Sequence, residues 1–474
     1  MDRIVTLNVD GKTITFNNQQ VEALDNILAW LKSDKLYYTL AGVAGSGKST
    51  CVKKVIELSR IRKDQICISA PTHKAKKVVS RMSGLDGKTM QSILGLRPDV
   101  LLEDFNPNYP IFNPIASPTI DEYLLIVIDE ASMINKGLLN LIKSLNKDYK
   151  IKFLFMGDPI QIPPVGEADS MVFLDEDIEI FWLTEVMRQN DGNPLMPIYD
   201  SIRVNLDDYY SGFDRKTNMN DKGEGVTYLN DRLAFRKLII SMFTSDEFKE
   251  NHEYVKVGAW TNDTVMKSNL LIRSAIFGDE VDIVEVNDIL MGYRTISDQT
   301  MKFNIIENSC DYKVIEKSEL EENSYGLKGY RLKLREDVTD MIKNYTRIFL
   351  IDISDYDNLH RYAEMHDQLK ANAIQFKKLW KVYYKFRRET MTSVDISTFR
   401  GGIKRGKQDY IVKDLDYGYS LTIHKMQGST YEHVMLLEDN IFENSLIEER
   451  NRILYTAMSR PRKSAIILSQ RTIN

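Results

Sequence analysis

The segment LYYTLAGVAGSGKSTCVKKV, residues 36–55, decides the fold, because it joins an apolar strand to a helix through a loop with three glycines. The loop, residues 42–49, fits the pattern G-x-x-x-x-G-K-[ST], and its strand and helix flanks are the context that makes this pattern specific. Main-chain N–H groups of such a loop wrap phosphates, and the helix N-terminus adds positive potential. We therefore predict an ATP site with Mg²⁺, in which Lys48 reaches the β- and γ-phosphates and Ser49 ligates the ion. The residues expected to hold the nucleotide are Gly42, Val43, Ala44, Gly45, Ser46, Gly47, Lys48, Ser49 and Thr50.

The chain around this loop alternates between apolar strand runs and helical patterns, from about residue 17 to residue 184. Continuous apolar strands such as QICISAP and LLIVIDE, separated by helices, predict a parallel sheet that is covered on both faces. Residues 1–16 alternate apolar and polar around an Asp-Gly pair, which predicts a small hairpin. The proline-rich residues 96–119 break the rhythm and predict a hairpin or loop that projects from the domain.

The second half of the chain resumes the α/β alternation with one interruption. Residues 185–280 and 395–474 show α/β patterns, whereas residues 281–394 carry short β-type runs and then a long helix from about 357 to 390. Short β runs of this kind suit a small antiparallel, barrel-like (SH3-like) domain. The sequence thus predicts the α/β fold class, with a first domain over residues 1–184 and a second domain that is split by the insertion.

Two core strands of the first domain end in polar groups. Asp129 and Glu130 end the strand LLIVIDE, and in a phosphate-binding α/β domain such a pair suits a Mg²⁺ ligand and a base that activates water. Gln161 lies just beyond the strand FLFMGD, where its amide would contact the γ-phosphate or the attacking water. These residues extend the predicted ATP site.

The composition limits the classes of binding partner and the compartment that we expect. The net charge is −5, so a nucleic-acid site would have to be a local basic channel on an acidic surface. The three cysteines are widely spaced, which favours small buried residues in a reducing compartment. The first residues lack a basic and apolar leader, and no apolar run approaches the ~20 residues of a membrane span. We expect a cytoplasmic protein that has no membrane partner.

These motifs resemble those of the superfamily-1 helicases of the B branch, the RecD and Dda type, over nearly the whole chain. Besides the phosphate loop, the segments that resemble family motifs are FNNQQVEAL (16–24), APTHKAKKVVS (70–80), KTMQSILGL (88–96), GDPIQIPPV (157–165), LTEVMRQN (183–190), YSLTIHKMQGSTY (419–431) and LYTAMSRPR (454–462). The resemblance implies two RecA-like domains with ATP between them and single-stranded DNA across their tops. The N-terminal hairpin and the inserted domain depart from the family pattern.

The resemblance also implies roles for particular residues. Arg188 and Arg460 would be arginine fingers, and Gln20 would read the adenine, with Gln19 as the alternative. Two further residues, Gln427 and Gly428, are expected on the nucleotide. The two arginines complete a predicted catalytic set that also contains Lys48, Asp129, Glu130 and Gln161.

Short polar and basic side chains near the ends of the predicted strands suit contacts to a phosphate backbone without base readout. The candidates for nucleic-acid binding are Pro71, Thr72, His73, Lys74, Thr89, Ser92, Thr261, Asn262, Thr422, His424 and Lys425. Members of the resembled family carry a pin in the projecting segment, and Phe105, then Tyr109, are our choices for its tip. Phe376, Trp380 and Tyr384 recur every four residues, which predicts a buried helix face.

Together, these patterns predict an ATP-dependent DNA helicase, a monomeric motor that acts on single-stranded DNA and on the duplex at a fork. The 5′→3′ polarity is implied by the resemblance alone. Two alternatives stay open: a superfamily-1 RNA helicase, and a DNA-stimulated ATPase that remodels nucleoprotein without unwinding. A non-catalytic binding module is disfavoured, because the whole predicted catalytic set is present.

Overall fold

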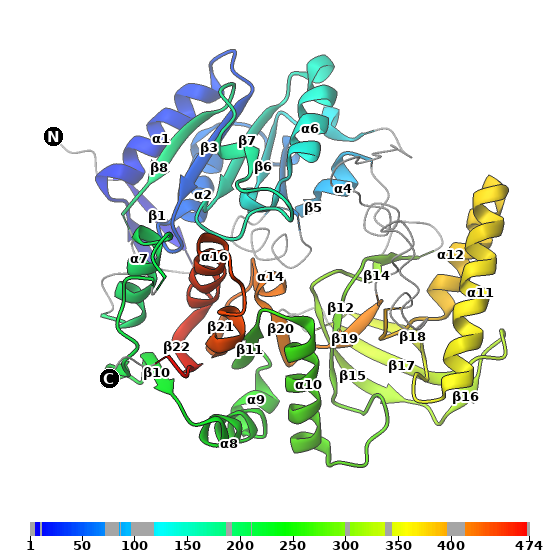
Figure 1. The fold of residues 1–474 in the computed structure, drawn as a ribbon. Helices are drawn as coiled ribbons and strands as arrows, with labels where there is room; N and C mark the ends of the chain where they lie inside the picture. The colour runs from blue at the N-terminus through cyan, green and yellow to red at the C-terminus, as the bar shows by residue number, and fades with distance from the viewer. Residues whose placement is uncertain are drawn as a thin grey trace.

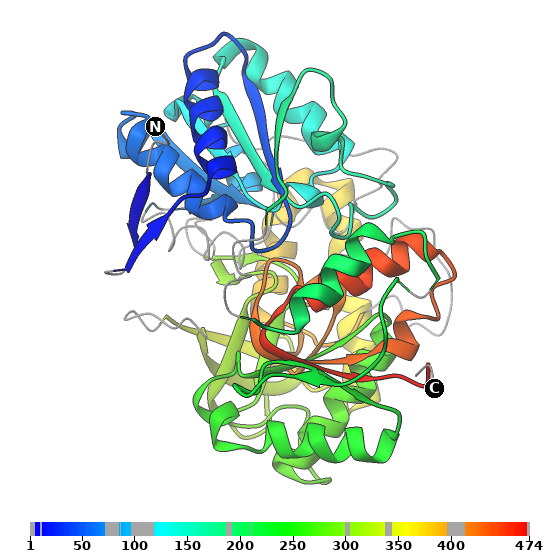
Figure 2. The same cartoon turned by 90° about the vertical axis from the view of Figure 1, so that its left-hand side faces the viewer.

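The α/β architecture is confirmed, with a first domain stacked above a second in Figure 1 and an inserted β domain beside the second. Figure 2 shows the two lobes from the side, with the helices that lie between them. The computed structural model describes residues 5–9, 12–71, 85, 87–95, 118–185, 192–209, 211–298, 304–336, 344–395 and 413–471.

The first domain is a six-stranded parallel sheet with helices on both faces. The strand order is β5 (Gly87–Thr89), β4 (Ile66–Ala70), β6 (Leu125–Ile128), β7 (Lys152–Gly157), β3 (Tyr37–Gly42) and β8 (Glu179–Leu183). The helices and short 3₁₀ turns are α1 (Asn18–Leu31), α2 (Lys48–Leu58), α4 (Met90–Ile93), α6 (Lys136–Tyr149), η1 (Lys63–Gln65), η2 (Ile120–Glu122), η3 (Ala131–Met133) and η4 (Met171–Phe173). Leu125 and Val127 pack on the side of α1 and α2, whereas Ile126 and Ile128 pack on the side of α6. Both faces of β6 are therefore buried, which explains its unbroken apolar run.

The N-terminal hairpin is confirmed, with β1 (Thr6–Val9) antiparallel to β2 (Lys12–Thr15). Helix α1 begins directly after it with a capping box. The Asn17 side chain accepts a hydrogen bond from the Gln20 main-chain N–H, and the Gln20 side chain accepts one from the Asn17 N–H. This cap fixes the start of the helix that carries both predicted adenine-reading glutamines.

The second domain has a six-stranded sheet of the same kind, parallel except for its edge strand β9. The strand order is β20 (Ser420–Thr422), β11 (Val255–Ala259), β21 (Tyr431–Leu437), β22 (Pro461–Leu468), β10 (Gly225–Leu229) and β9 (Asn218–Met219). The helices are α7 (Leu195–Val204), α8 (Arg232–Phe243), α9 (Asp246–Glu250), α10 (Asn262–Phe277), α14 (Ile423–Met426), α15 (Glu438–Ile441) and α16 (Ile447–Met458). Helices α7 and α16 pack on the face that is turned toward the first domain.

The inserted domain is an antiparallel sheet. Its strands are β16 (Glu321–Glu322), β17 (Lys328–Glu336), β15 (Asp311–Lys317), β12 (Ile289–Gly292) and β19 (Leu415–Tyr417), with β18 (Tyr345–Ile351) paired to β17 and a separate pair β13 (Ile296–Ser297) and β14 (Asn304–Ile306). Because β19 pairs with β12, the boundary that we expected at residue 395 is too early. The chain returns to the second α/β sheet only at β20.

The predicted long helix is two helices. Helix α11 (Tyr356–Gln375) ends at Phe376, whose backbone is extended, and the turn η6 (Lys377–Leu379) leads into α12 (Trp380–Glu389). This break resets the helical phase, so Tyr383 and Phe386 face the core. The predicted buried stripe is therefore wrong: Phe376 is 50% exposed, and Trp380 and Tyr384 are half-buried.

Two expectations from composition can be compared with the structure. The three cysteines are all buried and no disulfide joins them. Within the described residues, no helix has the length and apolar character needed to cross a bilayer.

Candidate nucleotide and nucleic-acid sites

The phosphate-binding loop has the geometry that its glycines permit. Gly45 and Gly47 have φ of +82° and +85°, in the left-handed region that favours glycine. A Cβ atom on Gly42 would come within 2.7 Å of the Ser46 Oγ. Lys48 Nζ donates to the carbonyls of Gly42 and Val43 at 2.6 and 3.0 Å, so the lysine is folded onto its own loop. The ammonium group thus lies at the loop that would hold phosphates.

The two predicted adenine-reading glutamines make different contacts. Gln20 is buried, and its Nε2 donates to the Ser46 carbonyl at 3.0 Å. Gln19 instead reaches the segment after β8, where its Nε2 donates to Thr184 Oγ1 at 2.9 Å and its Oε1 accepts from the Glu185 N–H at 3.1 Å. One glutamine therefore touches the phosphate loop, and the other touches the start of the segment that contains Arg188.

The acidic pair lies at the carboxyl end of β6, beside the loop. Glu130 has φ of +54°, a conformation that costs a non-glycine residue of order 1–3 kcal/mol and is found at functional sites. Burial and the neighbouring Asp129 raise the pKa of Glu130 to about 7, while the positive charges of Arg460 and Lys48 oppose this rise. Burial also raises the pKa of Asp129, against the charge of Lys48. Both side chains keep partial exposure.

Two buried polar atoms, one in the phosphate-binding loop and one in the segment after β7, find no partner in the described part of the chain. The Ser46 Oγ and the Gln161 Oε1 are both buried and make no hydrogen bond there. Buried polar atoms of this kind are rare, and a bound ligand or water is a usual reason for them. The contact of Gln161 with nucleotide or water stays a prediction.

The second domain brings Arg460 and Gln427 to the same place. Arg460 follows α16, and its Nη1 donates to the Ser429 carbonyl at 3.2 Å. Gln427 Nε2 donates to Ser132 Oγ at 3.3 Å and to the Ile162 carbonyl at 3.2 Å, both in the first domain. Gln427, which was expected on the nucleotide, thus bridges the two lobes directly. Gly428 follows it with φ of +75°.

The candidates for nucleic-acid contact gather at strand ends, as predicted. Pro71 follows β4, Thr89 ends β5 and Thr422 ends β20, so they lie at the carboxyl edges of the two parallel sheets. Three threonine hydroxyls cap the helices that follow: Thr89 accepts from the Ser92 N–H, Thr261 from the Thr264 N–H and Thr422 from the Lys425 N–H. The side chains of Ser92 and Asn262 are exposed.

The side chains of Lys425 and His424 are partly buried. Lys425 Nζ donates to Asn308 Oδ1 of the inserted domain at 2.8 Å and lies 4.5 Å from the centre of the Tyr293 ring. Burial, with the nearby charge of Lys413, lowers the pKa of Lys425 to about 8. Burial lowers the pKa of His424 as well. Lys425 therefore ties its motif to the inserted domain.

Six predicted site residues lie outside the described residues: Thr72, His73, Lys74, Phe105, Tyr109 and Arg188. Their roles stay predictions from the sequence.

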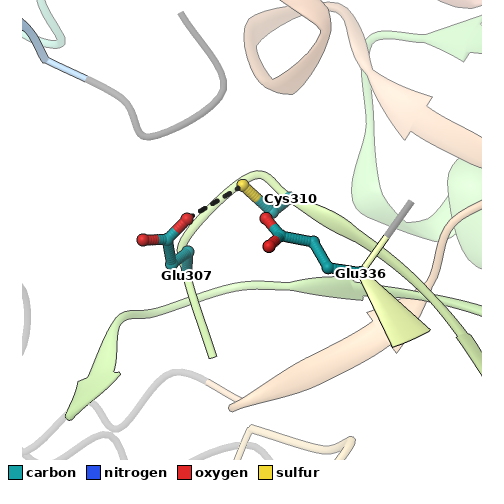
Figure 3. Close-up of side chains that lie close together, drawn as sticks. All are labelled: Glu307, Cys310 and Glu336. Carbon is teal, nitrogen blue, oxygen red and sulfur yellow. Dashed lines mark hydrogen bonds between the residues drawn. The ribbon is translucent and has the colours of Figure 1, made fainter. Parts of the chain in front are cut away.

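The structure also reveals groups that sequence reasoning missed. Tyr455 Oη donates to Asp158 Oδ2 at 2.6 Å across the two domains, a contact between residues 297 positions apart. Figure 3 shows a second group, Glu307, Cys310 and Glu336, whose ligating atoms lie within 4.8 Å of one another. The Cys310 thiol donates to the Glu307 carboxylate, at 3.7 Å between Sγ and Oε2. The spacing Glu-x-x-Cys in ENSC was the available signal for this pair.

Comparison with known proteins agrees with this geometry. Residues 15–205 match the family model of an AAA domain, and residues 417–468 match that of a UvrD-like helicase C-terminal domain. The chain is 26% identical to Uncharacterized protein R530 of Acanthamoeba polyphaga mimivirus, over 94% of this chain and 98% of that protein. It is 28% identical to the ATP-dependent DNA helicase dda of Enterobacteria phage T4, over 57% of this chain and 60% of that helicase.

Solved structures share the fold. The crystal structure of Bacteroides Pif1 bound to ssDNA matches with a TM-score of 0.52 at 16% identity, over 97% of this chain and 93% of that one. At this identity the match shows the fold alone. The two RecA-like domains, the phosphate loop with its acidic pair, and the relatives on both halves of the chain support a superfamily-1 DNA helicase of the B branch, with Dda as a named relative.

Proposed function

We propose that this chain hydrolyses ATP to move along single-stranded DNA in the 5′→3′ direction and to separate the duplex ahead of it. The observation that carries the proposal is the effect of Arg460, in the second domain, on Glu130, in the first. A cation that reaches the reacting groups from a second domain couples the chemistry to domain closure. A motor needs this coupling, and a passive nucleic-acid-binding module does not.

The residues fit Mg·ATP. Asp129 and Glu130 form an acidic pair whose charges are only partly compensated by Lys48 and Arg460, so the site favours a further cation. Asp129 and the Ser49 hydroxyl are the expected ligands of Mg²⁺. The ion, when bound, neutralises negative charge on the phosphates. The unpartnered Ser46 Oγ and Gln161 Oε1 are polar atoms that a bound nucleotide and its water would satisfy.

The proposed division of labour follows from the positions of the side chains. Lys48 would leave the loop carbonyls for the β- and γ-phosphates. Glu130, with a pKa of about 7, suits a general base, because a base works best when its pKa is near the working pH. Gln161 would orient the attacking water, and Arg188 and Arg460 would stabilise charge on the transferring group.

DNA is the proposed partner, because Dda is a DNA helicase by name and the Bacteroides Pif1 structure contains single-stranded DNA. In this proposal, the DNA strand would cross both lobes along the threonines at the strand ends, with Pro71, Ser92 and Asn262. The hydroxyls of Thr89 and Thr422, which accept a hydrogen bond as helix caps, keep a proton that can be donated to a phosphate oxygen.

The test combines ATPase assays with strand displacement. ATPase is measured alone, with single-stranded DNA and with RNA of the same base composition, and unwinding is measured on duplexes with 5′ or 3′ tails. We expect stimulation by DNA and unwinding of the 5′-tailed duplex. Preferential stimulation by RNA would favour an RNA helicase. Stimulation by DNA without strand separation would favour a remodelling ATPase, and unwinding of the 3′-tailed duplex alone would reverse the polarity.

A further inference from the structure

Tyr455 reaches from the second domain into the ATP site of the first. It lies on α16 and is fully buried. Its hydroxyl donates to Asp158 Oδ2 at 2.6 Å and accepts from the main-chain N–H of Ala44 at 3.4 Å. Ala44 belongs to the phosphate-binding loop, and Asp158 follows β7. The Tyr455 hydroxyl thus links the helix that precedes Arg460 to the loop and to the segment that carries Gln161.

The neighbours of Tyr455 hold the same segment of the first domain. Arg452 Nη1 donates to the Pro159 carbonyl at 2.6 Å, and the Ile162 N–H donates to Thr456 Oγ1 at 3.2 Å. Arg452 lies three positions before Tyr455 and four before Thr456, so its side chain neighbours both along the helix. This face of α16 therefore binds the chain around Gln161, and Tyr455 extends it to the loop.

The two bonds of the Tyr455 hydroxyl differ in strength. The bond to Asp158 is short and has a charged acceptor, and such bonds are about twice as strong as neutral ones. Asp158 is 1% exposed, so its carboxylate would lose a necessary partner without the hydroxyl. Burial and Asp158 raise the pKa of Tyr455 well above its usual value, which keeps the proton in place. The bond from Ala44 is long and therefore weak.

Because the bond from Ala44 is the weaker one, the phosphate-binding loop can shift while the Tyr455 hydroxyl stays bonded to Asp158. Main-chain N–H groups of the loop are the donors that phosphates take. A nucleotide that draws the loop N–H groups toward itself would weaken the contact from Ala44 and leave the bond to Asp158 intact. The change at Tyr455 would alter the position of Arg460, because the Arg460 Nε donates to the carbonyl of Thr456, the residue after Tyr455.

We propose that Tyr455 is a positioning residue that couples occupation of the phosphate loop to the placement of Arg460. The inference rests on the proposed ATPase function for its kinetic consequences. The proposed structural effect, in which bound nucleotide alters α16 through the Tyr455 hydroxyl, does not depend on hydrolysis.

Tyr455→Phe is the variant that isolates the hydroxyl, because it keeps the ring that packs edge-on against Tyr199 at 6.2 Å between centroids. We expect kcat for DNA-stimulated ATP hydrolysis to fall about tenfold or more, with KM for ATP changed less than about twofold. If Tyr455 had only a structural role, Tyr455→Phe would lower Tm, and kcat would not fall much more than KM changes. Tyr228→Phe is the matched control, because that hydroxyl is buried in the second domain and makes no hydrogen bond to the described residues. It should keep the parent kcat.

Amide hydrogen exchange of peptides that cover residues 447–460 supplies a readout without catalysis. Adding a non-hydrolysable ATP analogue should change exchange there in the parent and in Tyr228→Phe, but not in Tyr455→Phe at saturating analogue. The same change in all three proteins would overturn the inference, as would a Tyr455→Phe kcat within about twofold of the parent. A parent that hydrolyses no ATP would defeat the proposed function instead, and the exchange comparison would still decide the role of Tyr455.

Discussion

Arg460 in the second domain lies close enough to Glu130 in the first for its charge to lower the pKa of that carboxyl group. The effect opposes burial and the charge of Asp129, which together raise the pKa to about 7. The electrostatic environment of the proposed base is therefore shared between two domains. Separation of the lobes would remove one of the two cations that act on it.

The first prediction concerns the chemical step. Glu130→Gln should lower kcat about 10²–10⁴-fold, because the amide cannot take a proton from water. Lys48→Ala should abolish hydrolysis by removing a charge aimed at the transferring group. Steady-state ATPase with single-stranded DNA measures both, and binding of a fluorescent ATP analogue to Glu130→Gln is the control. Near-normal turnover of Glu130→Gln would show that another group is the base.

The second prediction concerns the arginines. Arg460→Ala should lower kcat about 10³-fold or more while KM for ATP changes little, because the guanidinium acts mainly on the transition state. Arg188→Ala, predicted from its motif, should behave in the same way. Arg462, which is exposed and close to Arg460 in the chain, offers the matched control in Arg462→Ala. An effect of Arg460→Ala on KM alone would contradict the finger role.

Much of this site could be predicted because its parts are local. The residues after β3, β6 and β7 follow apolar strands, and parallel strands bring their carboxyl ends to one edge. The contacts of Tyr455 with Asp158 and of Gln427 with Ser132 could not be predicted in this way, because each joins residues about 300 positions apart. These contacts depend on how two folded domains pack against each other, and no periodicity in the sequence encodes that packing.

The errors in the inserted domain have similar physical causes. Phe376, Trp380 and Tyr384 have the period of one helix face, but the break at Phe376 starts a new helix with a new phase. Strand β19 is only three residues long and carries little pattern of its own, so its pairing with β12 was invisible. In both cases tertiary packing overrode a local signal.

The third prediction concerns strand separation and comes from the sequence alone. Replacing both Phe105 and Tyr109 by alanine should leave DNA-stimulated ATPase and single-strand translocation nearly intact while unwinding falls strongly. A wedge must oppose base stacking, which costs about 1.4 kcal/mol per step, and an aromatic ring can replace a stacked base. Strand displacement and ATPase are measured on the same preparation. Equal losses in all three activities would indicate a motor defect, and undamaged unwinding would remove the wedge from this segment.

The fourth prediction concerns a buried ion pair between the second and inserted domains. Asp288 has no exposed surface and accepts hydrogen bonds from Arg273 Nη2 and Tyr419 Oη, both at 2.7 Å. Asp288→Ala leaves Arg273 buried without its anion, so the free energy of unfolding should fall by about 3–5 kcal/mol. Asp246→Ala removes an exposed pair with Lys249 and should lower the free energy of unfolding far less. Urea unfolding measures both, and equal effects would contradict the argument.

The last prediction concerns pH and Lys425. The unfolded chain keeps the Lys425 proton up to the ordinary pKa of 10.5, whereas the folded protein releases it at about 8. Between these pH values the unfolded state binds more protons, so the contribution of Lys425 to stability rises with pH. Its neighbours Asn308, Tyr293 and Lys413 stay the same in Lys425→Met, so the variant isolates this group. The free energy of unfolding of the parent minus that of Lys425→Met should therefore increase from pH 7.5 to pH 9.5, values chosen on either side of about 8. The exposed Lys267→Met is the control for exchanging a lysine for methionine. A constant difference for Lys425→Met would mean that the folded protein holds Lys425 as an ordinary solvated cation.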